Sequence, residues 1–103
     1  MAEATRIRAQ VSGDTATVRI LMSHVMENGL RKDAAGKPVP AWFIHEVEVQ
    51  HNGRSVLAAK FGPSVSKNPF LQFTLKGAKP GDRLVVSWVD DRGERRSDEA
   101  TVT

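Results

Sequence analysis

The chain has 103 residues, with 15 basic side chains, 12 acidic side chains, three histidines and no cysteine. A chain of this length can bury enough surface to fold without disulfides or metal, so we expect one domain over residues 1–103. The missing cysteines exclude a thiol nucleophile, a disulfide framework, a thiolate zinc site and an iron–sulfur cluster within these residues.

The first half of the chain alternates apolar and polar residues with a period of two, which is typical of β-strands. The alternation predicts four strands there, at residues 7–11, 15–22, 42–51 and 54–61. Between the last two lies Asn52-Gly53, a pair that tolerates the positive φ of a primed hairpin turn. We therefore expect these two strands to form a tight hairpin.

The second half continues the same pattern. Two strands are predicted at residues 70–76 and 83–90, and a polar last strand follows the turn at residues 91–93 and runs through Val102. The charges of this last strand suit the edge of a sheet. About seven short antiparallel strands in a chain of this size predict an all-β, immunoglobulin-like β-sandwich, in which the third and sixth strands are neighbours.

The connection at residues 23–40 is longer than the ~12 residues at which structureless loops become uncommon, and such loops are often functional. His24, Met26 and Glu27 lie close together in it and raise the hypothesis of a copper site. Their spacing matches no strong metal motif, so we expect no metal and no other cofactor. A small metal-binding redox domain is kept as an alternative function.

Other chemistry-bearing residues favour structural roles. His45 shares an alternating row with Phe43 and Val47, which predicts a hydrogen-bonded histidine packed in the core. Asp90 and Asp91 stand at a turn, where acidic residues commonly accept local hydrogen bonds. No catalytic constellation stands out, and we expect a protein that is not an enzyme.

Arg31, Lys32 and Lys37 could contact phosphates, which raises the hypothesis of nucleic-acid binding. Single-strand binding surfaces also need exposed aromatic side chains for base stacking. The chain has only four phenylalanines, two tryptophans and no tyrosine, and most of them fall on predicted core rows. We therefore expect no nucleic-acid partner. We expect no membrane insertion either, since no apolar run reaches the ~18 residues of a span.

The stronger signal is an apolar excess on sheet faces that should contact water. Trp42 and Ile44 share a row with glutamates, and Val85 and Val89 lie opposite the apolar row of their own strand. If the two strands are neighbours, these four residues form one outer patch, which predicts the centre of a partner interface. On that basis Ile44→Asp should abolish a complex and leave the domain folded. Coverage of the patch by the domain's own loops, and self-association through it, are the alternatives.

The segment LMSHVMENGLRKDAAGKPVP at residues 21–40 resembles the SoxZ family, the Z subunits of the SoxYZ carrier complex of bacterial thiosulfate oxidation. The matching residues of the loop are Ser23, His24, Met26, Glu27, Gly29, Arg31, Lys32 and Asp33, followed by Gly36, Lys37 and Pro40. Val25 stands where family members often have proline. The resemblance continues through the Asn52-Gly53 hairpin to the turn at residues 90–93, nearly the whole chain.

The resemblance implies a non-catalytic subunit that binds a SoxY-type partner, whose cysteine arm carries sulfur intermediates covalently. Other Sox enzymes would dock transiently on the complex. The amino-terminal residues show no secretory signal, and the resemblance implies a periplasmic location reached by export together with the partner. Two roles are open for Arg31, Lys32 and Lys37: positive charge near the anionic cargo, or solubility of the loop.

Overall fold

The computed structural model describes residues 3–103, and within them it contains seven strands and no helix. The strands are β1 Arg6–Ser12, β2 Thr15–Leu21, β3 Ile44–His51, β4 Arg54–Lys60, β5 Phe70–Lys76, β6 Arg83–Asp90 and β7 Arg95–Thr101. Accordingly, no helix that could span a membrane occurs among the described residues.

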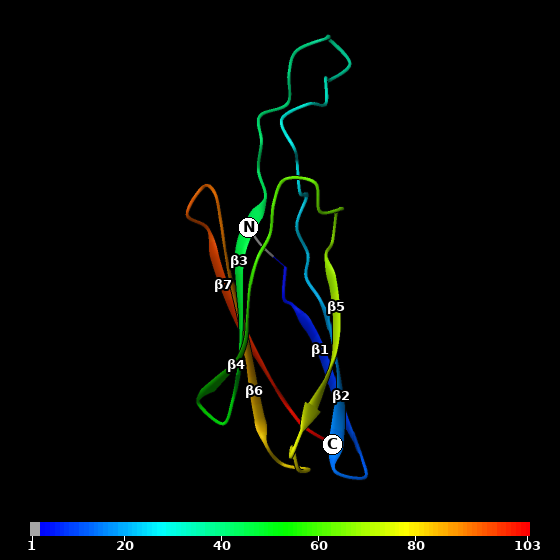
Figure 1. Ribbon diagram of the computed structural model, residues 1–103. Helices are drawn as coiled ribbons and strands as arrows, with labels where there is room; N and C mark the ends of the chain where they lie inside the picture. Colours follow the sequence, from blue (N-terminus) through cyan, green and yellow to red (C-terminus); the bar gives the residue numbers. More distant parts are fainter. Residues whose placement is uncertain (1–2) are drawn as a thin grey trace.

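The strands form two antiparallel sheets that pack face to face (Figure 1). One sheet has the order β1-β2-β5, and the other has the order β4-β3-β6-β7. This is the strand order of an immunoglobulin-like sandwich, with β3 beside β6. The predicted all-β sandwich and the predicted neighbourhood of these two strands are both confirmed.

The core lies between the sheets and is built by the alternating apolar rows. In β2 the residues Ala16, Val18 and Ile20 are fully buried, and in β6 the same holds for Leu84 and Val86. Removing this apolar surface from water is the main favourable contribution to folding, at roughly 25 cal/mol per Å² buried. The core therefore follows the period of two that the sequence shows.

A β-bulge in β3 changes which side chains face this core. Ile44 lies opposite Asp90 and Glu46 lies opposite Val89, so His45 is an extra residue without a partner in β6. Such an insertion reverses the alternation at that point. Ile44 is consequently 0% exposed and part of the core, while His45 is half-exposed and outside it. The predictions of an outer Ile44 and of a core His45 were both wrong.

The hairpin between β3 and β4 agrees with its prediction. Asn52 and Gly53 have φ values of +50° and +83°, as a primed turn with two left-handed residues requires. At this end of the sandwich His51 Nε2 lies 2.7 Å from Asp82 Oδ2, which joins the hairpin to the start of β6. The opposite end carries the segment that resembles the family motif.

Candidate functional site at the base of a projecting ribbon

Residues 27–42 form an irregular two-stranded ribbon that extends beyond the sandwich (Figure 1). At its base, the backbones of Glu27 and Trp42 exchange two hydrogen bonds of 2.7 and 2.9 Å. Further out, the N–H of Val39 donates to the carbonyl of Arg31 at 2.7 Å. The ribbon accounts for part of the elongated shape, 53 × 21 × 20 Å. The predicted long loop is thus a hydrogen-bonded projection.

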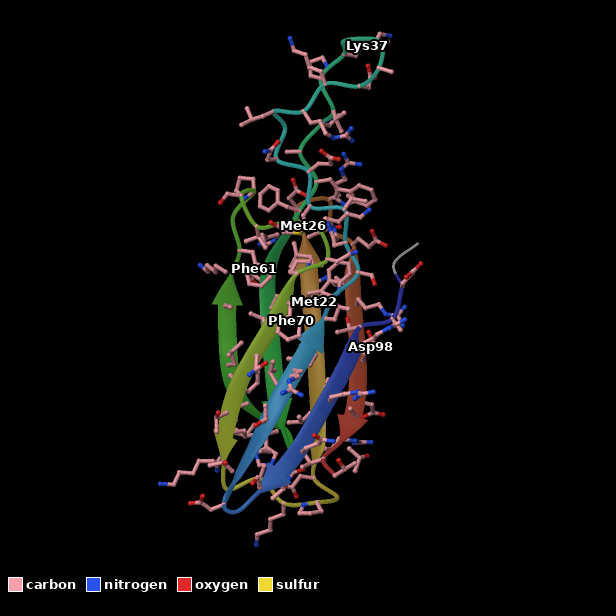
Figure 2. All side chains as sticks on the ribbon, turned by 90° about the vertical axis from the view of Figure 1, so that its right-hand side faces the viewer. Met22, Met26, Lys37, Phe61, Phe70 and Asp98 are labelled. Carbon is pink, nitrogen blue, oxygen red and sulfur yellow. The ribbon has the colours of Figure 1, made fainter. Side chains whose placement is uncertain are left out.

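The tip of the ribbon is shaped by one aspartate. Asp33 Oδ1 accepts hydrogen bonds from the backbone N–H groups of Ala35 and Lys37 at 2.9 and 3.0 Å. Gly36 sits between them with φ +79°, a conformation that side chains rarely adopt. The side chain of Asp33 therefore fixes the turn and places Lys37 at the end of the molecule (Figure 2).

Where the ribbon meets the sandwich, His24 is held in one tautomer. The backbone N–H of Met26 donates to His24 Nδ1 at 3.0 Å, so this nitrogen carries no proton. The other nitrogen, Nε2, then carries the proton and donates to Asp90 Oδ2 at 3.1 Å. His24 is 8% exposed, and neither ring nitrogen is left for a ligand.

Asp90 is the centre of this base cluster, which we define as His24, Trp42, Trp88, Asp90 and Arg92. Its Oδ2 atom also accepts a 2.7 Å hydrogen bond from Trp42 Nε1, and its Oδ1 atom accepts from two backbone N–H groups of the following turn. Burial raises the pKa of the carboxyl, but the donated hydrogen bonds of His24, Trp42 and the backbone together lower it below its ordinary value. Asp90 is therefore an ionised, 1% exposed carboxylate with four donors.

Aromatic packing completes the base cluster. The His24 ring contacts Trp42 and Trp88 edge to face, with both centroid separations at 5.3 Å. On the outside, the Arg92 guanidinium lies 4.5 Å from the centroid of the Trp42 ring, a cation–π geometry. The cluster thus joins residue 24, the ribbon and the end of β6 through hydrogen bonds and ring contacts.

The geometry does not suit a metal or an acid–base catalyst. Met26 Sδ accepts a hydrogen bond from the N–H of Ile44, and the Glu27 carboxylate binds Arg31, so these side chains do not converge with His24. No group of three or more potential ligands from His, Cys, Asp and Glu occurs among residues 3–103. A catalytic His–Asp pair also keeps one ring nitrogen free for its substrate, whereas both are occupied here. The base cluster is a structural joint.

One family of known proteins matches almost the whole chain. The family described as sulphur oxidation protein SoxZ matches residues 5–101. The chain belongs to the SoxZ family. Membership gives it a role in sulfur oxidation. None of the curated proteins with which it was compared matches it.

In this SoxZ-family chain the motif residues form one continuous path from the sandwich into the ribbon. Ser23, His24 and Met26 lie at the base, and the first strand of the ribbon holds Glu27, Gly29, Arg31, Lys32 and Asp33. Gly29 has φ +82°, and a Cβ atom there would lie 3.3 Å from Ala41 Cβ. The motif therefore encodes the attachment and the course of the ribbon.

One ion pair stiffens the first strand of the ribbon. Arg31 Nη2 lies 2.7 Å from Glu27 Oε1, and Arg31 Nε contacts both carboxylate oxygens. The hydrogen bond from Arg31 lowers the pKa of Glu27 below its ordinary value. Of the three cations singled out in the sequence, Arg31 thus has a partner within the ribbon.

The structure does not bring the four predicted interface residues together. Ile44 lies in the core, and Trp42 belongs to the base cluster. Val85 and Val89 lie half-buried on the outer face of the four-stranded sheet, where Ser87 separates them. Their cross-strand neighbours are polar, since Val85 lies opposite Gln50 and Glu99, and Val89 lies opposite Glu46 and Arg95. Partner binding by Trp42, Val85 and Val89 stays a prediction.

The hydrogen bonds of Asp90 were only partly predicted from the sequence. Its hydrogen bonds to the following turn agree with the prediction of local contacts, but its bonds to His24 and Trp42 were not foreseen. A signal was present, because Asp90 continues the buried alternating row of Leu84, Val86 and Trp88. Asp91 Oδ1 accepts a hydrogen bond from the backbone N–H of Phe43, the residue just before β3, and not from a group of its own turn.

Proposed function

We propose that this chain is the non-catalytic subunit of a heteromeric SoxYZ sulfur carrier. It binds and supports a SoxY-type subunit, whose carboxyl-terminal cysteine arm carries covalent sulfur intermediates during thiosulfate oxidation. The observation that carries the proposal is the family match over residues 5–101 in a chain without cysteine. A thiol-bound sulfur adduct therefore needs a second subunit.

The base cluster supports a scaffold role over a catalytic one. Its histidine has no free nitrogen and its carboxylate has four donors, so neither group is available to a substrate. A rigid joint of this kind holds the ribbon in a fixed direction. A fixed ribbon suits a subunit that presents a carrier arm to several enzymes in turn, which would dock transiently on the complex.

We propose that two lysines of the ribbon, Lys32 and Lys37, attract the anionic sulfur cargo or the enzymes that act on it. The ammonium groups of Lys32 and Lys37 are exposed and form no ion pair within the described part of the chain. Positive charge on an exposed surface attracts anions and speeds their association, and salt screens this attraction. Replacing both lysines with glutamine should slow sulfur turnover and weaken its salt dependence. Unchanged turnover and salt dependence would leave the lysines a role in solubility alone.

We further propose that the complex works in the periplasm and that the chain arrives there together with its partner. Fractionation of cells that express the chain with and without a SoxY-type subunit tests this. The chain should reach the periplasm only when the partner carries an export signal. Periplasmic chain in the absence of the partner would contradict the co-export proposal.

Co-expression with a SoxY-type subunit that bears a glycine-flanked cysteine arm tests whether the carrier complex forms. Size-exclusion chromatography with light scattering should show a stable complex of the two chains. If the folded chain remains alone, the carrier proposal is wrong. A homo-oligomer in that experiment would favour the self-associating module, and metal bound to the purified chain would favour the redox domain.

A further inference from the structure

Strands β1 and β7 lie along one long side of the sandwich and β5 lies along the other (Figure 2), and the two sides differ in how their strand edges are protected. On one side, β1 and β7 are closed by the end of the chain. The N–H of Thr103 donates to Ala9, and the N–H of Val11 donates to Thr103, both at 2.9 Å. Asp98 of β7 also accepts from the N–H of Thr5 at 3.0 Å. The charged sequence of β7, RRSDEAT, protects that edge further.

On the other side, the edge of β5 lacks these protections. This strand pairs only with β2, and its sequence, FLQFTLK, has no charge before Lys76. Natural proteins usually shield long uncharged edges with charges, proline, bulges or a covering segment. The connection at residues 61–69 turns over the ribbon end of the sandwich and does not follow β5 along its length (Figure 1). The described residues therefore leave this edge without a neighbour.

The place beside β5 is also one that immunoglobulin sandwiches often fill. In the constant-type arrangement, a fourth strand lies next to the strand that corresponds to β5. Here the preceding strand, β4, pairs with β3 in the opposite sheet, and the sheet of β5 stops at three strands. The fold thus has a vacant strand position at this edge.

The hydrogen-bond pattern between β2 and β5 shows which backbone groups of β5 point toward its free edge. The N–H of Met22 donates to the carbonyl of Pro69, so Leu21 and Phe70 are opposite each other without exchanging hydrogen bonds. Backbone groups alternate in direction along a strand. The N–H and C=O groups of Phe70, Gln72 and Thr74 therefore point toward the free edge.

The side chains along β5 determine which kind of added strand could pair with its free edge. Phe70 is 56% exposed and its neighbour Leu21 is 37% exposed, which makes an apolar pair on the outer face. Facing inward, Leu71 and Phe73 are only partly buried against the core. An added strand needs apolar side chains at its inward positions to cover them. It also needs a backbone that is extended and free to pair.

The charge of the outer face constrains the partner further. Strands β1, β2 and β5 contain no carboxylate, and they carry four cations, Arg6, Arg8, Arg19 and Lys76, at outward positions. Like charges on neighbouring strands repel, whereas opposite charges attract. A second copy of this chain would bring its own basic face. An added strand with neutral or acidic outward residues fits better.

From these features we infer that an extended segment of the SoxY-type partner adds as a fourth strand along the free edge of β5. This inference rests on the proposed carrier function, because the partner is the one proposed there. The segment has apolar residues facing the core and neutral or acidic residues facing outward. Its backbone pairs with Phe70, Gln72 and Thr74.

Amide hydrogen exchange of the labelled chain, free and in complex with the unlabelled partner, tests the inference. The amides of Phe70, Gln72 and Thr74 should exchange about tenfold more slowly, or slower still, in the complex. The amides of Ala58 and Lys60 face the free edge of β4, because Phe61 N–H donates inward to His45, and they should not change. They are the internal control.

A matched pair of variants gives a second readout. Thr74→Pro removes an N–H that pairs with nothing in the free chain, so the sandwich keeps its ladder. It should weaken partner binding by about tenfold, because it removes one ladder hydrogen bond and leaves the acceptor on the partner unpaired. Ala58→Pro makes the same change on the edge of β4 and should bind normally. Thermal unfolding verifies that both variants fold.

The outcomes separate the two proposals. A complex with unprotected β5 amides, or one that tolerates Thr74→Pro, would refute the edge inference and leave the carrier function intact. No complex with the wild-type chain would refute both. Protection of the β5 amides in a homodimer of the chain alone would overturn the choice of partner.

Discussion

The buried carboxylate of Asp90 offers the sharpest test of the ribbon joint. In Asp90→Asn, one of two acceptor oxygens becomes an NH₂ donor of almost the same size. Each oxygen accepts two hydrogen bonds in the native protein, so two of the four donors lose their acceptor. At about 1.5–3 kcal/mol for each hydrogen bond to a charged group, and with partial relief of burying a charge, the free energy of unfolding should fall by about 3–5 kcal/mol. The total free energy of unfolding of a small domain is only about 5–15 kcal/mol, so this loss would be a large part of it.

Urea unfolding, followed by tryptophan fluorescence and by circular dichroism, measures this loss. Asp91→Asn is the matched control, because Asp91 is exposed and accepts one hydrogen bond from Phe43, which an amide oxygen can also accept. The control should lose less than about 1 kcal/mol. If Asp90→Asn is as stable as the control, the base cluster does not hold the ribbon to the sandwich.

Three further predictions concern the sandwich. Hydrogen bonds from His51 and the backbone lower the pKa of Asp82 from 3.8 to about 2, so its contribution to stability is present above pH 3.8 and is lost as the pH falls through about 2. Thermal unfolding against pH should therefore show a deficit for Asp82→Asn at neutral pH that shrinks in this acid window, and a constant deficit would contradict the assignment. Gly53→Ala should cost about 1 kcal/mol in urea unfolding because its φ is +83°, whereas Gly62→Ala, which has open space and no positive φ, should be nearly neutral. Ile44→Ala should cost about 2–5 kcal/mol as a core truncation, and Ile44→Asp should fail to fold in circular dichroism; a folded Ile44→Asp would contradict its burial.

Much of the fold could be predicted because the local signals agree with each other. Alternating apolar rows mark β2 and β6 directly, and Asn52-Gly53 marks the hairpin between β3 and β4. Both signals depend only on residues close together in the sequence. The all-β class and the neighbourhood of β3 and β6 followed from them.

The prediction of an outer Ile44 was wrong at a point where the sequence carries no clear mark. Strict alternation places Ile44 with Trp42 on the outer face, but the bulge at His45 turns Ile44 inward. A bulge depends on pairing with β6, where the partner of Ile44 is Asp90, 46 residues further along the chain, and it therefore cannot be predicted from β3 alone. The same holds for the pairing of His24 with Asp90, which are 66 residues apart.

The ribbon was foreseen as an unusual segment but not as an ordered projection. Its few cross-bridges, such as the one between Glu27 and Trp42, leave no long alternating pattern. Family resemblance identified the residues, and the structure shows how they act. His24 anchors the base, Gly29 permits the close approach of Ala41, and Asp33 shapes the tip.

The most direct test of the carrier function is native mass spectrometry of the chain mixed with a SoxY-type subunit, before and after loading with sulfur. We expect a complex of the two chains, with the added sulfur mass on the partner and an unchanged mass for this chain. Separate free chains, or sulfur mass on the cysteine-free chain itself, would contradict it.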